Sequence, residues 1–511
     1  MIHRDGNCTS LWQDNIFPYK SFNKLPVNRY YDIVIVGGGI TGITTALLLQ
    51  EAGKKCIVLE AANLCFGTTG GTTAHINTIM DTPYHTISVN FGKENARSVA
   101  NAAKEAVALI KNNIAQYDID CEFEDSDAYL FSRDKEQTKE LEEIRSGSEE
   151  AGISINYSNN IPVPVPFEKA IKIPGQGKFN PVDYVYALAA AFEKAGGIIL
   201  QQCRVNSVIE NKQAEVETSS GKFIANQLIY ATHIPPGVNL IHLRCVPCRS
   251  YAIAVQLRDD NYPESLCYDM DDPYHYYRTQ IINDERYFIA GGYDHKTGHE
   301  ENTQKCFLEL EAHVHKYFDV GTVSYQWSSQ YFETTDGLPY IGRLPGHTDL
   351  IYVATGYGGN GITYSHIAAK LLKNILLNEE TPYLSVFNPN RIKPIAGFKN
   401  FITHNADVIK QFAGKWFSHD KLHELTDLAN GEGKVIIYEG EKIALYKDEN
   451  GELHAINPTC THLKCSVAWN NAERSWDCPC HGARYSFDGE MITGPASINL
   501  EKINIEELVE K

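Results

Sequence analysis

Residues 31–42 read YDIVIVGGGITG, and this stretch decides the fold of the first part of the chain. The apolar run from Ile33 to Val36 is typical of a strand that is buried on both faces of a parallel sheet. Three glycines follow at once, and the next residues, ITTALLLQEAG, predict a helix that ends at Gly53. A second strand then runs from Lys55 to Leu59. This order of strand, glycine turn, helix and strand is the context in which G-x-G-x-x-G predicts dinucleotide binding.

The residues of this motif have separate roles in such a site. Gly37 permits the tight turn, Gly39 lets the backbone approach a pyrophosphate, and Gly42 lets the helix and the strand pack closely. The helix N-terminus directs partial positive charge toward the phosphates. Glu60 ends the second strand and would accept hydrogen bonds from the adenosine ribose. The motif does not by itself choose between FAD and NAD, and a bare tight turn is the alternative.

The next loop, residues 63–75, reads NLCFGTTGGTTAH and helps to distinguish FAD from NAD. Backbone amides and hydroxyls of Gly67, Thr68 and Thr69 could lie along a flavin, with a plain polar loop as the alternative. From this loop onward the chain resembles the D-amino-acid oxidase superfamily, which includes glycine oxidase and the sarcosine and dimethylglycine dehydrogenases. Some members carry a histidine here that binds FAD covalently. Because Gly71 stands at that place, the resemblance implies non-covalent FAD.

The resemblance returns at residues 334–342, TTDGLPYIG, which precede a strand and a glycine-rich turn that opens a helix. NAD dehydrogenases lack this segment, so the two segments together predict FAD. In the superfamily, the amides of the turn approach the flavin ring, and the helix N-terminus stabilises negative charge on the reduced flavin. The resemblance places these residues here: Gly356, Gly358, Gly359, Gly361, Ile362 and Thr363.

The segment between these two regions is predicted to form a substrate domain. Strands that alternate in polarity over residues 240–330 predict an antiparallel sheet. Within the run YHYYR, alternation puts Tyr274, Tyr276 and Arg278 on one face. Arg278 could clamp a substrate carboxylate, with a surface or salt-bridged arginine as the alternative. The amino-acid oxidases of the superfamily carry a carboxylate-binding arginine where this chain has Tyr331, which puts an α-amino-acid substrate in doubt.

Two cysteines and a histidine in the same region are assigned structural roles. The Cys245-x-x-Cys248 pair precedes a strand, whereas a redox pair of this spacing normally opens a helix. We therefore expect two buried structural cysteines. His233 replaces a glycine that ends a strand in related flavoproteins, and we expect a hydrogen-bonded structural histidine there.

The C-terminal part is organised around residues 460–482, CTHLKCSVAWNNAERSWDCPCHG. This stretch contains two pairs of metal ligands, Cys460-x-His462 and Cys478-x-x-His481. A Cys/His quartet on its own allows a structural zinc site. Gly482 directly after the second pair suits a tight loop, and the Gly-Pro-Ala turn at residues 494–496 suits a rigid third loop. These features favour a different kind of metal site.

The three loops resemble those of the Rieske [2Fe–2S] proteins, in which two cysteines bind one iron and two histidines bind the other. The spare cysteines, Cys465 and Cys480, could join the first two loops by a disulfide. Lys464 replaces the usual glycine of the first loop. Ala483 stands where high-potential members have a serine, and Tyr485 matches a tyrosine whose hydroxyl serves a ligand cysteine.

The predicted fold class is α/β followed by all-β. A Rossmann-like FAD-binding domain is interleaved with an antiparallel-sheet substrate domain, and an all-β Rieske domain follows. Proline-rich sequence after the last flavin helix predicts a linker with a bridging helix. The predicted boundaries are 28–380 for the oxidoreductase, 381–423 for the linker and 424–511 for the Rieske domain. Within the oxidoreductase, the FAD segments are predicted at about 28–80, 170–235 and 335–378, and the substrate domain at about 85–165 and 240–330.

Composition and charge exclude several classes. The net charge of −18 disfavours a nucleic-acid or anionic-membrane partner. No apolar stretch is long enough for a spanning helix. The polar N-terminus is not expected to be a signal peptide, and residues 1–29 are expected to lie on the surface as an arm. The 13 cysteines are mostly scattered singly, which fits a cytoplasmic location with the cluster-loop disulfide as the exception.

These observations predict an FAD-dependent dehydrogenase of a small molecule, acting on a C–H bond next to nitrogen. The cluster would take the electrons from FAD and deliver them to an external acceptor, a protein or a quinone. Two alternatives stay open: a flavin reductase fed by NAD(P)H, and a redox sensor or electron-transfer protein without an amine substrate. We expect no nucleic-acid partner.

Overall fold

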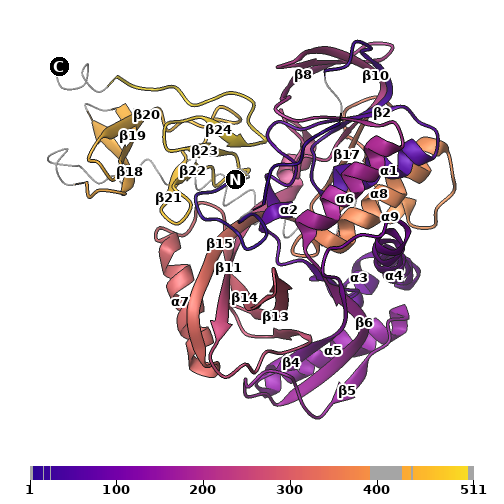
Figure 1. The fold of residues 1–511 in the computed structure, drawn as a ribbon, viewed down its shortest axis with the longest axis vertical. Helices are drawn as coiled ribbons and strands as arrows, with labels where there is room; N and C mark the ends of the chain where they lie inside the picture. The colour runs from indigo at the N-terminus through magenta and orange to yellow at the C-terminus, as the bar shows by residue number, and fades with distance from the viewer. Residues whose placement is uncertain (1–3, 15, 23–24, 392–427, 439–440, 505–511) are drawn as a thin grey trace.

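A computed structural model describes residues 4–14, 16–22, 25–391, 428–438 and 441–504 (Figure 1). The predicted bridging helix lies outside these ranges. The chain forms an α/β part with two large sheets and a C-terminal β domain, drawn in yellow, which lies against one side of the α/β part. None of the helices in the described ranges combines the length and the apolar character that a bilayer crossing needs.

An eight-stranded sheet carries the glycine motif. β1 is paired in parallel with β10 and β2, and its residues from Ile33 to Val36 are buried, as the apolar run predicts. Helix α1 follows β1 and packs against α6 and α8. The strands are, in spatial order, β16 (Tyr340–Arg343), β17 (Ile351–Thr355), β10 (Gly221–Tyr230), β1 (Tyr30–Val36), β2 (Cys56–Leu59) and β7 (Ile198–Leu200), with β9 (Ala214–Thr218) paired to β10 and β8 (Val205–Glu210) to β9.

The helices of the α/β part begin where the sequence offers start signals. In α6, for example, the Asn180 side chain accepts hydrogen bonds from the backbone of Val182 and Asp183, and Pro181 occupies the first helical position. The helices are α1 (Ile40–Glu51), α2 (Thr68–Gly71), α3 (Tyr84–Phe91), α4 (Lys93–Gln116), α5 (Lys135–Ala151), α6 (Pro181–Lys194), α7 (Thr303–Tyr317), α8 (Gly361–Leu377) and α9 (Leu384–Phe387), with a short 3₁₀ helix, η1 (Leu240–Arg244).

A nine-stranded sheet forms most of the region that was predicted to be the substrate domain, and that name is kept below. Most of its neighbouring strands are antiparallel, as predicted, and β12 pairs with β4 in parallel. Two strands depart from the prediction: β3 and β6 were expected within FAD segments, but β6 pairs with β4, β5 and β3 of this sheet. The order is β15 (Val320–Thr334), β11 (Cys245–Leu257), β14 (Glu285–Lys296), β13 (His275–Ile282), β12 (Leu266–Asp269), β4 (Glu124–Ser132), β6 (Lys169–Lys178) and β3 (His75–Ile76), with β5 (Asn156–Ser158) beside β6.

The C-terminal β domain contains two small antiparallel sheets, which confirms the all-β prediction. The four-stranded sheet lies next to β11 and β15 of the substrate domain, and the three-stranded sheet lies farther out (Figure 1). The strands are β18 (Gly433–Tyr438), β19 (Glu441–Lys447) and β20 (Leu453–Ile456) in one sheet, and β21 (Ala468–Asn470), β22 (Ser475–Asp477), β23 (Arg484–Ser486) and β24 (Met491–Thr493) in the other.

The beginning of the chain corrects a prediction. Residues 4–14 do not lie on the surface as an arm but pack between the α/β part and the C-terminal β domain. The Trp12 side chain is buried, and its Nε1 donates to the Thr72 carbonyl. Leu11 is buried in the main core of the α/β part. A tryptophan and a leucine that are buried in this way remove apolar surface from water, which stabilises the contact.

Candidate functional site

The glycine turn after β1 has almost no room for side chains. Gly37 has a φ of +111°, and a Cβ atom there would lie 2.5 Å from the Ala231 carbonyl oxygen. A Cβ atom at Gly42 would lie 2.0 Å from the Gly37 carbonyl oxygen. At Gly39 a Cβ atom would approach Thr69 Oγ1 to 2.8 Å. Gly37, Gly38 and Gly39 also line the main cavity, so the backbone of this turn faces it, as a pyrophosphate would need.

Glu60 supports the same turn from the end of β2. Its carboxylate accepts hydrogen bonds from the backbone N–H of Gly38 at 2.7 Å and of Ala62 at 2.8 Å. Burial raises the pKa of Glu60, and these hydrogen bonds lower it in part. The side chain lines the main cavity beside Arg204. The carboxylate thus lies where a ribose hydroxyl could donate to it.

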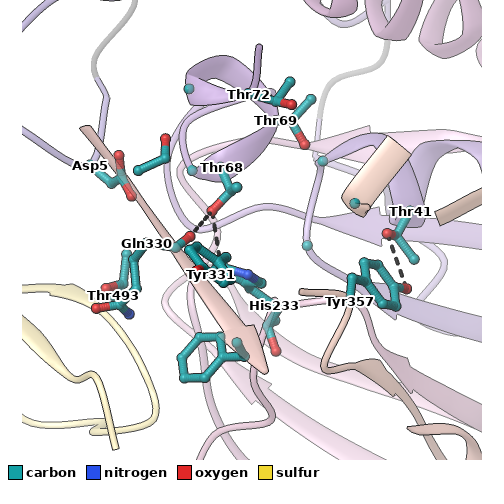
Figure 2. A pocket seen from close by; sticks show the side chains of 18 of the residues that line it. Asp5, Thr41, Thr68, Thr69, Thr72, His233, Gln330, Tyr331, Tyr357 and Thr493 are labelled. Carbon is teal, nitrogen blue, oxygen red and sulfur yellow. Dashed lines mark hydrogen bonds between the residues drawn. The ribbon is translucent and has the colours of Figure 1, made fainter. Parts of the chain in front are cut away.

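The threonine-rich loop forms another wall of the cavity (Figure 2). Thr68 Oγ1 donates to the Gln330 carbonyl at 2.9 Å and lies 3.2 Å from His233 Nδ1. His233 is hydrogen-bonded, as expected of a structural histidine, but it also lines the cavity. Burial lowers the pKa of His233 to about 4, so its imidazole is neutral near pH 7. Gly67 and Thr69 line the cavity as well.

Gly71, which stands where some relatives have a FAD-linking histidine, lies in this loop. It also lines the cavity, but a Cβ atom there would lie 2.0 Å from Ser329 Oγ. A larger side chain at this position would therefore displace the Ser329 hydroxyl.

The glycine-rich turn before α8 lines another part of the cavity. Gly358, Gly359, Gly361 and Ile362 line it, whereas Gly356 and Thr363 do not. Thr363 is fully buried and donates to the Asn77 carbonyl, so its hydroxyl is used inside the protein. Gly359 N–H donates to Asp81 Oδ2 at 2.6 Å.

Sequence reasoning missed the part of the cavity that distant segments contribute. Asp5 from the N-terminal segment lines it, and so does the third loop of the C-terminal β domain, residues 491–494 together with Ala496 and Ser497. Figure 2 shows Asp5 and Thr493 on the side nearest this domain. No local pattern could have placed them, because they reach the cavity only through the packing of the domains.

The four predicted cluster ligands come together in the C-terminal β domain. The side chains of Cys460 and Cys478 are in hydrogen-bonding contact, which lowers the pKa of Cys460. The rings of His462 and His481 lie 5.0 Å apart. Tyr485 OH lies 3.3 Å from Cys460 Sγ, as the Rieske resemblance implies. The predicted disulfide between Cys465 and Cys480 is confirmed.

The protonation of His462 suits iron binding. Its Nε2 lies 3.1 Å from the Gly237 carbonyl oxygen and must donate, since a carbonyl only accepts. The neutral ring then has its lone pair on Nδ1, which is buried and has no hydrogen-bond partner in the structure. A hydrogen bond that fixes the far nitrogen of a ligand histidine is a common support of metal sites. The residues present therefore fit a [2Fe–2S] cluster.

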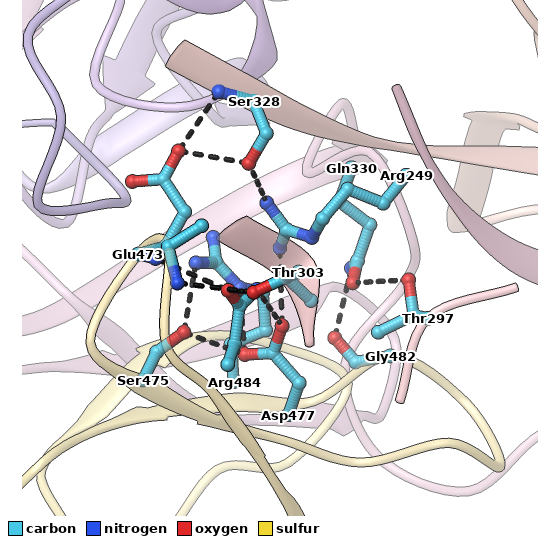
Figure 3. A network of polar contacts seen from close by, with 12 residues as sticks. Arg249, Thr297, Thr303, Ser328, Gln330, Glu473, Ser475, Asp477, Gly482 and Arg484 are labelled. Carbon is cyan, nitrogen blue, oxygen red and sulfur yellow. Dashed lines mark hydrogen bonds and ion pairs between the residues drawn. The ribbon is translucent and has the colours of Figure 1, made fainter. Parts of the chain in front are cut away.

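A buried polar network joins the C-terminal β domain to the α/β part (Figure 3). Asp477 lies between two arginines: its Oδ2 is 3.2 Å from Arg249 Nη2, and its Oδ1 is 3.1 Å from Arg484 Nε. Burial alone would raise the pKa of Asp477, but the two arginines outweigh burial and hold it at about 2. Arg249 also donates to Ser328, which in turn donates to Glu473.

Glycine brings a cluster loop close to the substrate domain. Gly482 has a φ of +74°, and a Cβ atom there would lie 2.8 Å from Pro247 Cβ and from Gln330 Nε2. Its carbonyl accepts a hydrogen bond from Gln330 Nε2 at 2.9 Å. The residue that follows the second histidine ligand is therefore in direct contact with β11 and β15.

Arg278 occupies a different place from the one the carboxylate-clamp hypothesis needs. It does not line the cavity, although Tyr274 and Tyr276 of the same predicted face do. The side chain is fully buried, and its Nη1 donates to the carbonyls of Thr73 and Ala74. Arg278 thus positions backbone in the threonine-rich loop rather than reaching a substrate. Cys245 and Cys248 are buried and unpaired, in agreement with a structural role.

The fold and the two sites define an oxidoreductase with a nucleotide cavity that is joined to an iron–sulfur domain. The chain belongs to the DAO family of FAD-dependent oxidoreductases, whose family model matches residues 32–375, and the Rieske [2Fe-2S] domain model matches residues 418–504. The oxidoreductase part binds FAD, and the C-terminal β domain, called the Rieske domain below, binds a [2Fe–2S] cluster.

Known proteins resemble both the whole chain and its parts. The protein YhfW of Bacillus subtilis (strain 168), named as a Rieske 2Fe-2S iron-sulfur protein, is 33% identical over 95% of this chain and 96% of its own length. Gamma-glutamylputrescine oxidoreductase of Escherichia coli (strain K12) is 25% identical over 70% of this chain and 86% of its own. The glycine oxidase of Geobacillus kaustophilus shares the fold, with a TM-score of 0.61, 18% identity and coverage of 71% of this chain and 100% of its own.

Proposed function

We propose that this oxidoreductase dehydrogenates a C–N bond of an amine or an amino-acid-like small molecule, and that the electrons pass from FAD to the Rieske cluster and on to an external acceptor. Bound FAD supplies hydride acceptance from a C–H bond next to nitrogen. The cluster accepts one electron at a time. We further propose a cytoplasmic location, which the unpaired buried cysteines outside the cluster loops support.

One observation carries this proposal: the Rieske domain contributes its third loop to the cavity that the glycine motif and the threonine-rich loop also line. The cluster histidines lie at the same boundary. His242 of η1 has its ring 4.7 Å from the ring of His462 and 5.9 Å from that of His481. Electrons that leave the flavin site would therefore meet the cluster within the same chain.

Two observations bear on the class of substrate. Tyr331 lines the cavity where the amino-acid oxidases have their carboxylate-binding arginine. The Escherichia coli relative is named for its action on gamma-glutamylputrescine, which is an amine. The first point disfavours an α-amino-acid substrate, and the second favours an amine.

An anaerobic substrate screen tests the proposal. Amines, amino acids and NAD(P)H are mixed in turn with the oxidised holoprotein, and two signals are followed: bleaching of the flavin absorbance and appearance of the paramagnetic signal of the reduced cluster. We expect an amine to produce both signals in that order. Bleaching by NAD(P)H alone would instead identify a flavin reductase. No bleaching by any donor would identify a redox sensor, and a cluster that stays oxidised after flavin bleaching would contradict the internal electron path.

A further inference from the structure

One region of the cavity is built from aromatic rings and carboxylates. It lies where β11, β14 and β15 meet the segment before β13. Tyr274 and Tyr276 have ring centroids 5.8 Å apart, and a Cβ atom at Gly291 would lie 2.1 Å from the Tyr276 ring, so only glycine leaves that ring its place. Tyr331 adds a third phenol from β15. These three tyrosines and Asp294 are called the tyrosine cage below.

Asp294 is the charged group of the tyrosine cage. Tyr331 OH donates to its Oδ2 at 2.8 Å, and Tyr274 OH lies 3.5 Å from the same oxygen. The Ser250 hydroxyl also faces this carboxylate and lowers its pKa. The other carboxylate oxygen, Oδ1, is buried and accepts no hydrogen bond of normal geometry among the described residues. A buried carboxylate oxygen that accepts no hydrogen bond costs free energy, so we expect a bound ligand to donate a hydrogen bond to Oδ1.

The charges around the tyrosine cage are negative. Burial raises the pKa of Asp294 to about 6 and that of Asp81 to about 7. Repulsion by Glu333 contributes to both shifts, and Asp294 also contributes to the shift of Asp81. Of the described residues that line the cavity, Arg204 is the only lysine or arginine, and it lies beside Glu60. Lys296 acts on Glu333 from outside the lining. The negative charge at Asp294 therefore has no cationic partner in the cavity wall.

We propose that the tyrosine cage binds an organic cation, so that the substrate is a diamine or polyamine whose second, non-reacting ammonium group lies against Asp294 and the tyrosine rings. This inference rests on the proposed function and specifies its substrate class. Tyrosine faces attract cations through the ring quadrupole, and the attraction is larger where water is excluded. The same wall repels a substrate carboxylate.

The chemistry requires two different nitrogens. In the dehydrogenation, the C–H bond breaks and its electron pair leaves as hydride to FAD, a C=N bond forms, and a proton leaves the reacting nitrogen. That nitrogen must be neutral, because its lone pair forms the new bond. The positive charge that Asp294 holds must then belong to another group of the same molecule.

Binding of a cation that cannot react gives the first test. Tetramethylammonium has no nitrogen lone pair, and its binding to the oxidised holoprotein is measured by calorimetry with acetate as the anionic control. We expect tetramethylammonium to bind and acetate not to bind. Asp294→Asn, which keeps the shape and removes the charge, should weaken tetramethylammonium on the order of tenfold. Asp349→Asn, at an exposed ion pair with Arg343, is the matched control and should leave binding unchanged.

A matched pair of substrates gives the second test. 1,4-Diaminobutane and butylamine differ only in the second amine, and the ratio of their kcat/KM values measures the contribution of that group. We expect a strong preference for the diamine that Asp294→Asn removes. Two results would overturn the tyrosine cage proposal and leave the proposed function standing, provided that amines bleach the flavin. In the first, tetramethylammonium and acetate bind alike. In the second, Asp294→Asn changes neither the binding of tetramethylammonium nor the preference for the diamine. If no amine bleaches the flavin, the proposed function is wrong and this inference fails with it.

Discussion

Arg249 of β11 and Asp477 of β22 form a buried ion pair across the boundary between the substrate domain and the Rieske domain, with 3.2 Å between Nη2 and Oδ2. The pair belongs to a network that also includes Arg484 and Asp5. Solvent-exposed ion pairs contribute little to the free energy of unfolding. In a buried network, by contrast, removing one charged group leaves the others buried without a counter-charge. The attachment of the Rieske domain is thus sensitive to single charges.

The first prediction concerns this attachment. Asp477→Asn leaves Arg249 and Arg484 buried without their shared carboxylate, and we expect the free energy of unfolding to fall by about 3–5 kcal/mol. Urea unfolding followed by tryptophan fluorescence measures the change. Asp319→Asn, at the exposed pair with Arg258, is the control and should cost less than about 1 kcal/mol. Equal effects of the two substitutions would contradict a stabilising network.

The second prediction is the pH dependence of the same contribution. The pKa of Asp477 is about 2 in the folded protein, and an unperturbed aspartate has a pKa of about 3.9. The folded value is the lower one, so the stabilisation is present above the unfolded pKa and is lost as the pH falls through the folded pKa. Between about pH 4 and pH 2, we expect the wild type to lose stability more steeply than Asp477→Asn. Parallel acid curves would show that Asp477 is not the group involved.

The third prediction concerns the reduction potential of the cluster. Reduction adds negative charge, which hydrogen bonds to the sulfurs stabilise. Ala483 is buried and offers no hydroxyl, whereas Tyr485 OH lies 3.3 Å from Cys460 Sγ. We expect a potential below that of the high-potential respiratory proteins, a higher potential in Ala483→Ser and a lower one in Tyr485→Phe. A shift of about 59 mV changes a one-electron equilibrium tenfold.

Voltammetry on both variants checks this prediction. Tyr446→Phe is the control, because Tyr446 packs against Trp469 and His454 elsewhere in the Rieske domain. Its midpoint should equal that of the wild type. Unchanged midpoints in all three variants would mean that these hydroxyls do not tune the cluster.

The fourth prediction is that FAD is held without a covalent bond. Gly71 stands where some relatives have a linking histidine, and a Cβ atom there would lie 2.0 Å from Ser329 Oγ. Acid precipitation should therefore release the yellow flavin into the supernatant. Flavin that remains in the washed pellet would contradict this expectation.

The fifth prediction concerns the metal. His462 presents a buried Nδ1, and the side chains of Cys460 and Cys478 are in contact, which suits one histidine-bound and one cysteine-bound iron. Metal analysis of anaerobically prepared protein should give two irons for each flavin, as a [2Fe–2S] cluster requires. Zinc in place of iron would overturn the assignment of the four ligands. Chelation of the metal should bleach the cluster signal and leave the flavin absorbance.

The elements near the motifs could be predicted from sequence because their signals are local. The glycine turn from Gly37 to Gly42 requires backbone without side chains, and the surrounding apolar strand and helix have clear periods. The loops around Cys460 and Cys478 are equally local, and the disulfide between Cys465 and Cys480 joins them as the resemblance implied. In each case, neighbours in the sequence are also neighbours in the site.

The parts that sequence could not place depend on packing between distant segments. Alternation put Arg278 on the face of Tyr274 and Tyr276 but could not show that its guanidinium turns to the carbonyls of Thr73 and Ala74. Asp294 lies in no sequence motif, and the tyrosines around it come from β13, β15 and the segment before β13. The sequence placed β6 within an FAD segment, and only its pairing with β3, β4 and β5 shows that it belongs to the other sheet.

The N-terminal segment has a consequence for how the molecule is assembled. Arg4 pairs with Glu473 and Asp5 with Arg484, so residues from the two ends of the chain meet. During synthesis the ion pairs of Arg4 and Asp5 with Glu473 and Arg484 cannot form until the Rieske domain has emerged, whereas Trp12 has its partner, Thr72, in the oxidoreductase part. Contacts between such distant positions also form late, since closing a long loop costs entropy. The ion pairs of this segment are therefore among the last contacts to form, and the final stability of the oxidoreductase part depends on completion of the Rieske domain.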